Sequence, residues 1–235
     1  MSILDQTGKR DFVVRAGTWD RLILELVLTG EYGTLDFTDK IVVDVGAHIG
    51  GFSVLAALGG ARRVLAFEAG AENNALLVVN CEPFPVVECH HGAVWRSDVG
   101  AGLLQWKKSA NSENTGGGSV LDCTSICGGA LTATDLQEVN TIPFDDIVHR
   151  VGAVDLLKID AEGSEYPILL TSRTLHRVRE IVGEYHTVSG VAETQASAGY
   201  SEWNIGKLGQ HLADNGFVVE VHDKGTLGLF RAFRR

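Results

Sequence analysis

The sequence lacks long apolar runs and is poor in cationic side chains. A membrane-spanning helix needs about 20 consecutive apolar residues, and no such run is present, so no membrane span is expected. The start of the chain also lacks the basic residues and apolar stretch of a secretory signal, which favours a cytoplasmic location. The 20 Lys and Arg residues are outnumbered by 30 Asp and Glu residues, which gives a net charge of −10. Because binding of duplex DNA or long RNA relies on basic patches, this balance favours a small molecule or a saccharide over a nucleic acid as the partner.

Cysteines in a metal-binding arrangement are missing as well. The sequence has four cysteines and no C-x-x-C pair, and its closest two, Cys123 and Cys127, are separated by three residues. Cys89 is followed by His90 and His91, but neighbouring residues of a strand point to opposite faces, so the two rings cannot easily share one ion. We therefore expect reduced thiols and no bound metal ion.

The most informative segment is residues 40–51, with the sequence KIVVDVGAHIGG. Its β-branched residues predict a strand that is buried on both faces and carries Asp44 near its end. Gly46 and Gly50 then allow a tight turn and a close approach of a ligand to the backbone. Residues 52–58 predict a helix whose first N–H groups point at whatever occupies the turn.

A second strand is predicted over residues 64–68 and ends in Glu68. This acid follows the turn by about 20 residues, where nucleotide-binding folds place the acid that binds the ribose. A dinucleotide fingerprint would need a glycine at His48, and the charge of Asp44 is poorly suited beside a diphosphate. Both features favour S-adenosylmethionine, which carries a sulfonium, an ammonium, a ribose and an adenine but no phosphate. The expected cofactor contacts are Asp44, Gly46, Ala47, His48, Gly50 and Glu68, with Ala93 near the adenine.

Strands and helices alternate along most of the chain. Strands are predicted over 41–45, 64–68, 86–89, 154–160, 180–186, 217–221 and 227–233, and helices over 20–28, 52–58, 72–80, 169–179 and 203–215. This order predicts an α/β fold with a doubly wound, mainly parallel seven-stranded sheet. Only residues 223–226 separate the last two strands, which is too few for a crossover helix, so the last strand is expected to be antiparallel. We expect a single domain over 1–235, with an N-terminal helical segment over 1–38, an irregular insertion over 99–130 and a mobile loop over 187–200.

Several segments together resemble the FkbM-type methyltransferases. Residues 156–165, LLKIDAEGSE, look like the family signature L-K-I-D-x-E-G-x-E, and residues 44–50, DVGAHIG, are similar to its D-V-G-A-x-x-G turn. The chain departs from the family pattern at Ala69, where proline is common, and at His48, where asparagine is frequent. The likeness covers roughly residues 12 to 190, because further segments fall in the family's order at 15–20, 30–32, 144–147 and 184–186.

The resemblance implies a Rossmann-like class I methyltransferase fold with S-adenosylmethionine as the cofactor. It also implies methyl transfer to an acceptor, most often a hydroxyl of a natural product or a saccharide. N-methylation of an amine or a peptide stays open, as do an NAD-dependent oxidoreductase and a scaffold without activity.

The candidate catalytic residues come from the signature and from the strand that follows it. A hydroxyl has a very high pKa, so a base should take its proton as the new bond forms. His186 is the first candidate, and Glu184 shares its face of the strand. Asp160 is expected to face the methionine moiety of the cofactor or the acceptor, and Glu162 to bind the acceptor or serve as a second base. Glu165 is interpreted either as a partner of Glu162 or as a helix-start acid, and a divalent cation held by the acids with His186 is an alternative.

Overall fold

The protein is represented by a computed structural model that describes residues 12–123, 125–127, 129–130, 136–193, 195, 203–223 and 225–235. Residues 1–11 of the expected N-terminal segment lie outside the described residues, and so do 194 and 196–200 of the expected loop. Within the described part of the chain, no helix is long and apolar enough to cross a bilayer.

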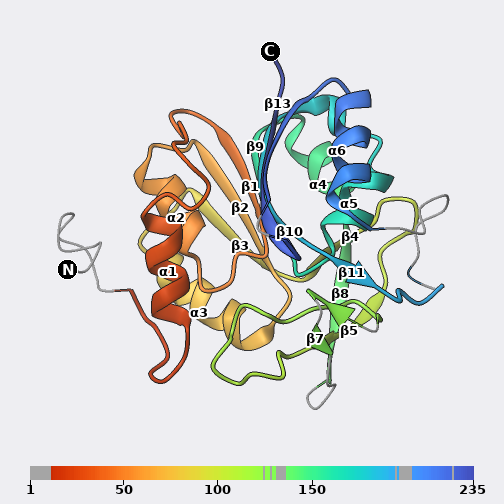
Figure 1. Cartoon of the computed structure of the whole chain (residues 1–235). Coiled ribbons are helices and arrows are strands. Elements are labelled where there is room, and N and C mark those ends of the chain that lie inside the picture. The colour runs from red at the N-terminus through yellow and green to blue at the C-terminus, as the bar shows by residue number, and fades with distance from the viewer. Residues whose placement is uncertain are drawn as a thin grey trace.

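A seven-stranded sheet forms the centre of the fold (Figure 1). Its strand order is β12-β13-β10-β9-β1-β2-β3. The strands are β1 (Ile41–Val45), β2 (Arg63–Glu68), β3 (Val87–His91), β9 (Val154–Ile159), β10 (Val178–His186), β12 (Val218–Asp223) and β13 (Leu227–Phe233). All neighbours pair in parallel except β13, which is antiparallel to both β10 and β12. The predicted sheet and its antiparallel last strand are confirmed.

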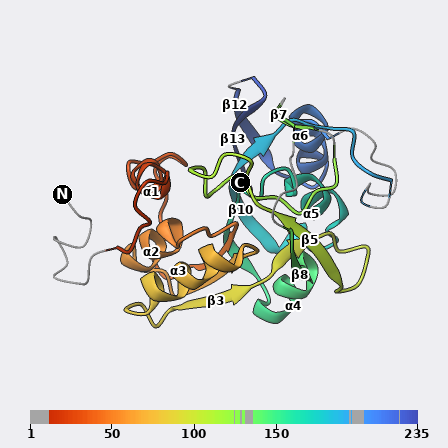
Figure 2. The ribbon, with the colours of Figure 1, turned by 90° about the horizontal axis from the view of Figure 1, so that it is seen from below.

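Helices cover both faces of this sheet (Figures 1 and 2). On one side lie α1 (Asp20–Leu28), α2 (Gly51–Leu58) and α3 (Ala71–Cys81), and on the other lie α4 (Phe144–Val151), α5 (Glu165–Thr171) and α6 (Ile205–Asp214). Val42 and Leu156 pack in the apolar cluster that includes residues of α1 and α2, whereas Val43 and Leu157 pack in the cluster that includes α4 and α5. All four are fully buried. This burial on both faces explains why the strand sequences are continuous apolar runs.

The predicted helix over 169–179 is wrong. The helix α5 begins earlier and ends at Thr171, a 3₁₀ turn η1 follows over Leu175–Arg177, and β10 begins at Val178. The carboxylate of Asp145 holds the chain out of the helix here, because it accepts hydrogen bonds from the side chains of Ser172 and Thr174 and from the N–H of Arg173. The break therefore depends on a residue that lies far away in the sequence.

The segment over 99–130 contains more regular structure than expected. Its strand β5 (Leu103–Lys107) pairs with β8 (Leu136–Pro143), which in turn pairs with β4 (Ala93–Trp95). A second small sheet joins β6 (Ser125–Ile126), β7 (Gly129–Ala130) and β11 (Val188–Ser189). Both small sheets lie beyond the lower ends of the central strands in Figure 1, at the end where β1, β2, β9 and β10 finish.

Candidate active site

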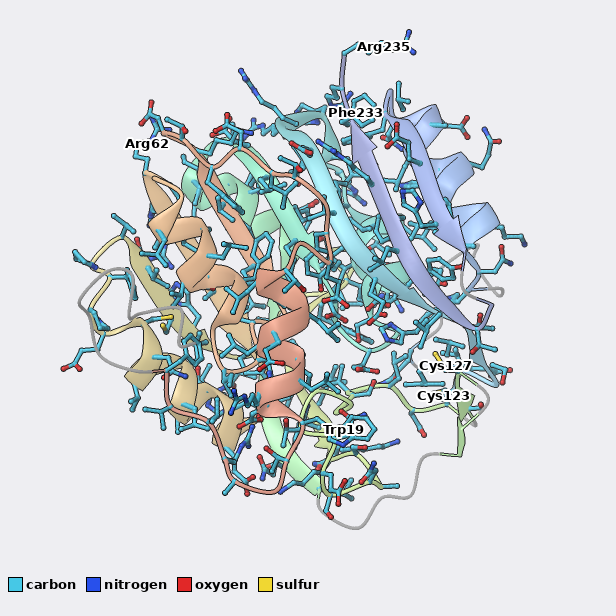
Figure 3. The ribbon with its side chains drawn as sticks, turned by 60° about the vertical axis from the view of Figure 1, so that its left-hand side comes forward. Trp19, Arg62, Cys123, Cys127, Phe233 and Arg235 are labelled. Carbon is cyan, nitrogen blue, oxygen red and sulfur yellow. The ribbon has the colours of Figure 1, made fainter. Side chains whose placement is uncertain are left out.

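A cavity of about 630 Å³ opens at the carboxyl ends of β1, β2, β9 and β10. This volume is within the range that small-molecule sites occupy, and ligands of open α/β sheets bind at this end of the strands. Trp19 at one end of α1 lines the cavity, as does Cys127. Figure 3 shows these two residues on the lower part of the molecule, whereas Arg62 and Phe233 lie at the opposite end of the sheet.

Gly46 forms the floor of the cavity, where β1 turns toward α2. Its φ is +73°, and an added Cβ would lie 1.8 Å from the main-chain oxygen of Asp160. Gly46 and Ala47 both donate their N–H to the carbonyl oxygen of Phe67, at 3.0 and 2.9 Å. Glycine is therefore required for the end of β1 to approach the ends of β2 and β9.

Replacing Gly46 by alanine is expected to lower the free energy of unfolding by about 3 kcal/mol or more, since overpacking and a positive φ both act against a side chain. Urea unfolding measures this change. Gly100→Ala is the matched control, because an added Cβ there has no atom within 4 Å. An equal effect of both substitutions would contradict the close approach at Gly46.

Glu68 is buried at the end of β2 with its carboxylate held in place. Its Oε1 accepts a hydrogen bond from the Gly70 N–H at 2.8 Å, and its Oε2 accepts one from the His48 N–H at 2.9 Å. Burial raises the pKa of Glu68, although these hydrogen bonds act in the opposite direction. A carboxylate oxygen can accept two hydrogen bonds. Oε1 also accepts one from Asn73 Nδ2 at 3.4 Å, so Oε2 is the oxygen that keeps capacity for a ligand hydroxyl.

His48 joins the glycine turn to α1 and to residue 115. Its Nε2 lies 2.9 Å from Thr115 Oγ1 and 3.6 Å from Asp20 Oδ1. Burial lowers the pKa of His48 to about 4, against the opposing effect of Asp20. The ring is therefore neutral at pH 7 and presents a polar, uncharged edge to the cavity that it lines.

Asp20 connects the segment before α1 to Thr115, which lies beside the cavity-lining residue Asn114. It is fully buried, accepts hydrogen bonds from the Arg15 N–H and guanidinium at 2.8 and 2.9 Å, and accepts one from the Thr115 hydroxyl at 2.6 Å. Burial raises the pKa of Asp20, but these partners outweigh it and lower the pKa to about 2. These contacts hold the segment over 15–20 in place, and Trp19 of that segment lines the cavity.

Asp20→Asn is expected to lower the free energy of unfolding by about 2 kcal/mol at pH 7. Because the folded-state pKa is depressed, this stabilisation is complete above the ordinary value of 3.8 and is lost as the pH falls through about 2. The difference between the wild-type chain and the variant should therefore vanish near pH 2 in a series of urea titrations. A difference that stays constant from pH 7 to pH 2 would contradict this role of the carboxylate.

Asp44 does not line the cavity, contrary to its predicted contact with the cofactor. It is fully buried beneath the turn, where Oδ2 accepts a hydrogen bond from Ser53 Oγ at 2.6 Å and Oδ1 lies 3.2 Å from Lys158 Nζ. Burial lowers the pKa of Lys158, but Asp44 and Asp160 outweigh this and raise it. Lys158 also donates a hydrogen bond to the Gly46 carbonyl at 2.6 Å, so the Asp44–Lys158 ion pair fixes the position of the glycine turn.

Ala47 and Gly50, two other residues predicted to contact the cofactor, do not line the main cavity. Ala47 lies beside it, and Gly50 precedes α2, where an added Cβ would meet Leu77 and Cys81 at 3.1 Å. Both therefore shape the turn instead of touching this cavity. Ala93 does line it and is buried, so its place near the adenine stays a prediction.

The signature strand and β10 bring four acids and one histidine together on the opposite wall. His186 Nε2 lies 3.4 Å from Glu162 and 3.6 Å from Glu184, and its Nδ1 lies 3.4 Å from Glu165. Asp160, at the end of β9, accepts a hydrogen bond from the Tyr32 hydroxyl at 3.1 Å. We call this set, Asp160, Glu162, Glu165, Glu184 and His186, the acid–histidine cluster.

The crowding of carboxylates in the acid–histidine cluster shifts several pKa values. Burial raises the pKa of Glu162 to about 7. Burial and the charge of Asp160 raise the pKa of Glu184 to about 8. Burial alone would lower the pKa of His186, but Glu162 and Glu165 outweigh it and raise that pKa well above its ordinary value. The ring of His186 consequently carries a proton at pH 7 in this arrangement.

The sequence analysis missed several residues of the site. Glu165 was named, but its burial was not expected: it begins α5, is a fully buried member of the cluster, and its Oε1 accepts a hydrogen bond from the Ala161 N–H at 2.7 Å. Lys158 lies inside the signature and Tyr32 inside a segment that resembles the family, so both could have been found there. Trp19 likewise lies in a segment that resembles the family, but its part in lining the cavity depends on how α1 packs.

Comparison with known families and structures gives one match that covers most of the chain. The family model described as the Methyltransferase FkbM domain matches residues 44–219. No curated protein matches the chain.

Solved structures similar to this chain include several methyltransferases. A methyltransferase FkbM from Methylobacillus flagellatus is 16% identical, with a TM-score of 0.48, and the match covers 85% of this chain and 44% of that one. A precorrin-6y C5,15-methyltransferase from Geobacter metallireducens is 13% identical, with a TM-score of 0.48 and coverage of 95% and 93%. A protein from Pyrococcus horikoshii assigned as an RNA methyltransferase is 16% identical, with a TM-score of 0.46 and coverage of 98% and 96%. At these TM-scores the likenesses carry no conclusion about the acceptor.

Proposed function

Because the chain belongs to the FkbM methyltransferase domain family, we propose that it transfers the methyl group of S-adenosylmethionine to a hydroxyl of a small natural product or a saccharide. S-adenosylmethionine is the cofactor of this methyltransferase, so we discard the alternative of an NAD-dependent oxidoreductase. One observation carries the proposal for the acceptor, namely that four members of the acid–histidine cluster line the same cavity as Glu68, at the ends of different strands. These four are Asp160, Glu162, Glu184 and His186.

The residues around the glycine turn fit this cofactor. Gly46 leaves the backbone open at the floor of the cavity, and Oε2 of Glu68 keeps acceptor capacity for a ribose hydroxyl. His48 is neutral there, and Asp160 offers a carboxylate toward the ammonium of the methionine moiety. In this proposal Asp44 acts by positioning the turn through Lys158.

The cluster would bind the acceptor and manage its proton. When bound, the cofactor supplies an electrophilic methyl group on a sulfonium. Glu184 lines the cavity and is partly exposed to it. We assign to the ionised form of Glu184, which predominates above its pKa of about 8, the acceptance of the hydroxyl proton as the O–CH₃ bond forms and the C–S bond breaks. His186, which already carries a proton, orients Glu162 and Glu184 instead of acting as the base. Alignment of the two reactants in one cavity supplies much of the remaining acceleration.

A small acceptor agrees with the charge of the chain and of the site. The net charge is −10, and the acceptor side of the cavity is itself lined by acids. A polyanion such as RNA would be repelled there. A neutral, hydroxyl-rich molecule would instead find hydrogen-bond acceptors.

A labelling screen tests the proposed acceptor class. The chain is incubated with cofactor bearing a deuterated methyl group and with separate pools of hydroxylated metabolites, amines and RNA. Mass spectrometry should find labelled methyl ethers in the first pool. Label confined to amines or to RNA would contradict the proposal.

A further inference from the structure

Three donor atoms of the acid–histidine cluster have a spacing that suits a metal ion. One donor atom each from Asp160, Glu162 and His186 lie within 4.8 Å of one another. Ligands bound at about 2.0–2.2 Å to one ion lie about 3–4 Å apart, so small side-chain adjustments would bring all three to one ion. Within the described residues, no second group of His, Cys, Asp or Glu donors comes this close.

His186 points into this group without a hydrogen bond at an ordinary distance. The residue is 3% exposed, and its Nδ1 has no hydrogen-bond partner. Its Nε2 lies 3.4 Å from Glu162 and 3.6 Å from Glu184, longer than the usual range of about 2.7–3.2 Å for N–H···O hydrogen bonds. Nδ1 faces Glu165, at 3.4 Å, whereas Nε2 faces Glu162. A buried polar group in this state requires an explanation, and an ion between Nε2 and the Glu162 carboxylate would supply one for Nε2.

The backbone and the neighbouring residues hold the carboxylates toward the ring. Glu162 adopts a φ of +50°, which is uncommon for a residue with a side chain and recurs at functional sites. Its carbonyl oxygen accepts a hydrogen bond from Ser119 Oγ at 2.8 Å. Tyr32 donates to Oδ2 of Asp160 at 3.1 Å, an arrangement that orients a ligating carboxylate from outside the site.

We propose that Asp160, Glu162 and His186 bind one divalent cation of the Mn²⁺ class. The ion would bind the neutral imidazole and so displace the proton that the ring carries when no ion is bound. Two carboxylates and one imidazole combine hard oxygen donors with a nitrogen donor, which suits Mn²⁺ better than a calcium site built from oxygen alone or a thiolate zinc site. The group faces the cavity beside Glu184, so an open coordination position could receive an oxygen of the acceptor. Only this last role rests on the proposed function.

Electron paramagnetic resonance tests the site directly, because the signal of free Mn²⁺ decreases as the ion binds. The full chain is titrated with Mn²⁺ alone, with no cofactor or acceptor present. We expect saturable binding of one ion per chain, and at least a tenfold weaker affinity in Asp160→Asn and in Glu162→Gln. Both are isosteric changes of partly exposed residues, and circular dichroism verifies that the variants are folded. The control is Glu220→Gln, an exposed carboxylate on β12 that should leave the affinity unchanged.

Two results would overturn the site. One is the absence of saturable Mn²⁺ binding by the wild-type chain. The other is binding that neither Asp160→Asn nor Glu162→Gln weakens. Because methyl transfer is not measured, a chain that binds Mn²⁺ but methylates no hydroxyl would refute the proposed function and leave the ion site intact.

Discussion

Replacing Glu184 by glutamine is expected to lower kcat for methyl transfer by roughly 10²–10⁴-fold, the usual contribution of a general base. Glutamine keeps the size of the side chain but cannot accept the proton of the acceptor hydroxyl. Glu184 lies at the carboxyl end of β10, on the wall opposite Glu68. The substitution should therefore leave affinity for the cofactor within about twofold of the wild-type value.

The measurement pairs single-turnover kinetics with calorimetry on the same variant. The acceptor is one identified by the labelling screen, and Glu220→Gln serves as the control for loss of a carboxylate elsewhere. Unchanged turnover in Glu184→Gln would remove this residue from the reaction. A loss of turnover that merely follows a loss of cofactor affinity would assign Glu184 to binding instead.

Glu68→Gln is expected to weaken binding of the demethylated cofactor, S-adenosylhomocysteine, by about 100-fold. The amide nitrogen cannot accept a hydrogen bond, so it would face either the N–H of His48 or that of Gly70 as a second donor. The neutral side chain also loses a charge-assisted hydrogen bond to the ribose, which contributes about 1.5–3 kcal/mol. A loss of about 3 kcal/mol corresponds to the stated change in affinity.

Isothermal titration calorimetry with S-adenosylhomocysteine measures this effect. Thermal unfolding of the variant separates a local change from a general loss of stability. Glu220→Gln should bind like the wild-type chain. Affinity that is retained in a folded Glu68→Gln protein would mean that the ribose is bound elsewhere.

The sequence predicted the central sheet because its signals are local. Val42 and Val43 face different apolar clusters in a strand buried on both sides, and short spacing between β12 and β13 fixes their antiparallel pairing. The two small sheets were missed for the opposite reason. β4 has three residues, and its partner β8 comes about 40 residues later, so no local pattern identifies either as part of a sheet.

The sequence placed most of the candidate residues at the end of the sheet where the cavity lies, but it could not give the depth of each side chain. His186, Glu184, Glu162 and Asp160 do meet on one wall, as the ends of adjacent parallel strands should. Asp44 was placed in the cavity, whereas it lies beneath the turn against Lys158, because the depth of a side chain below a turn depends on tertiary packing. The raised pKa of His186 likewise depends on Glu162 and on Glu165, and the spacing of residues does not show that Glu165 is buried.

Calorimetric titration of the wild-type chain with S-adenosylhomocysteine, and separately with NADH, tests most directly that this cavity binds a phosphate-free nucleoside. Binding of S-adenosylhomocysteine with a Kd on the order of micromolar, together with no measurable response to NADH, is the expected result. Tight binding of NADH without any response to S-adenosylhomocysteine would contradict it.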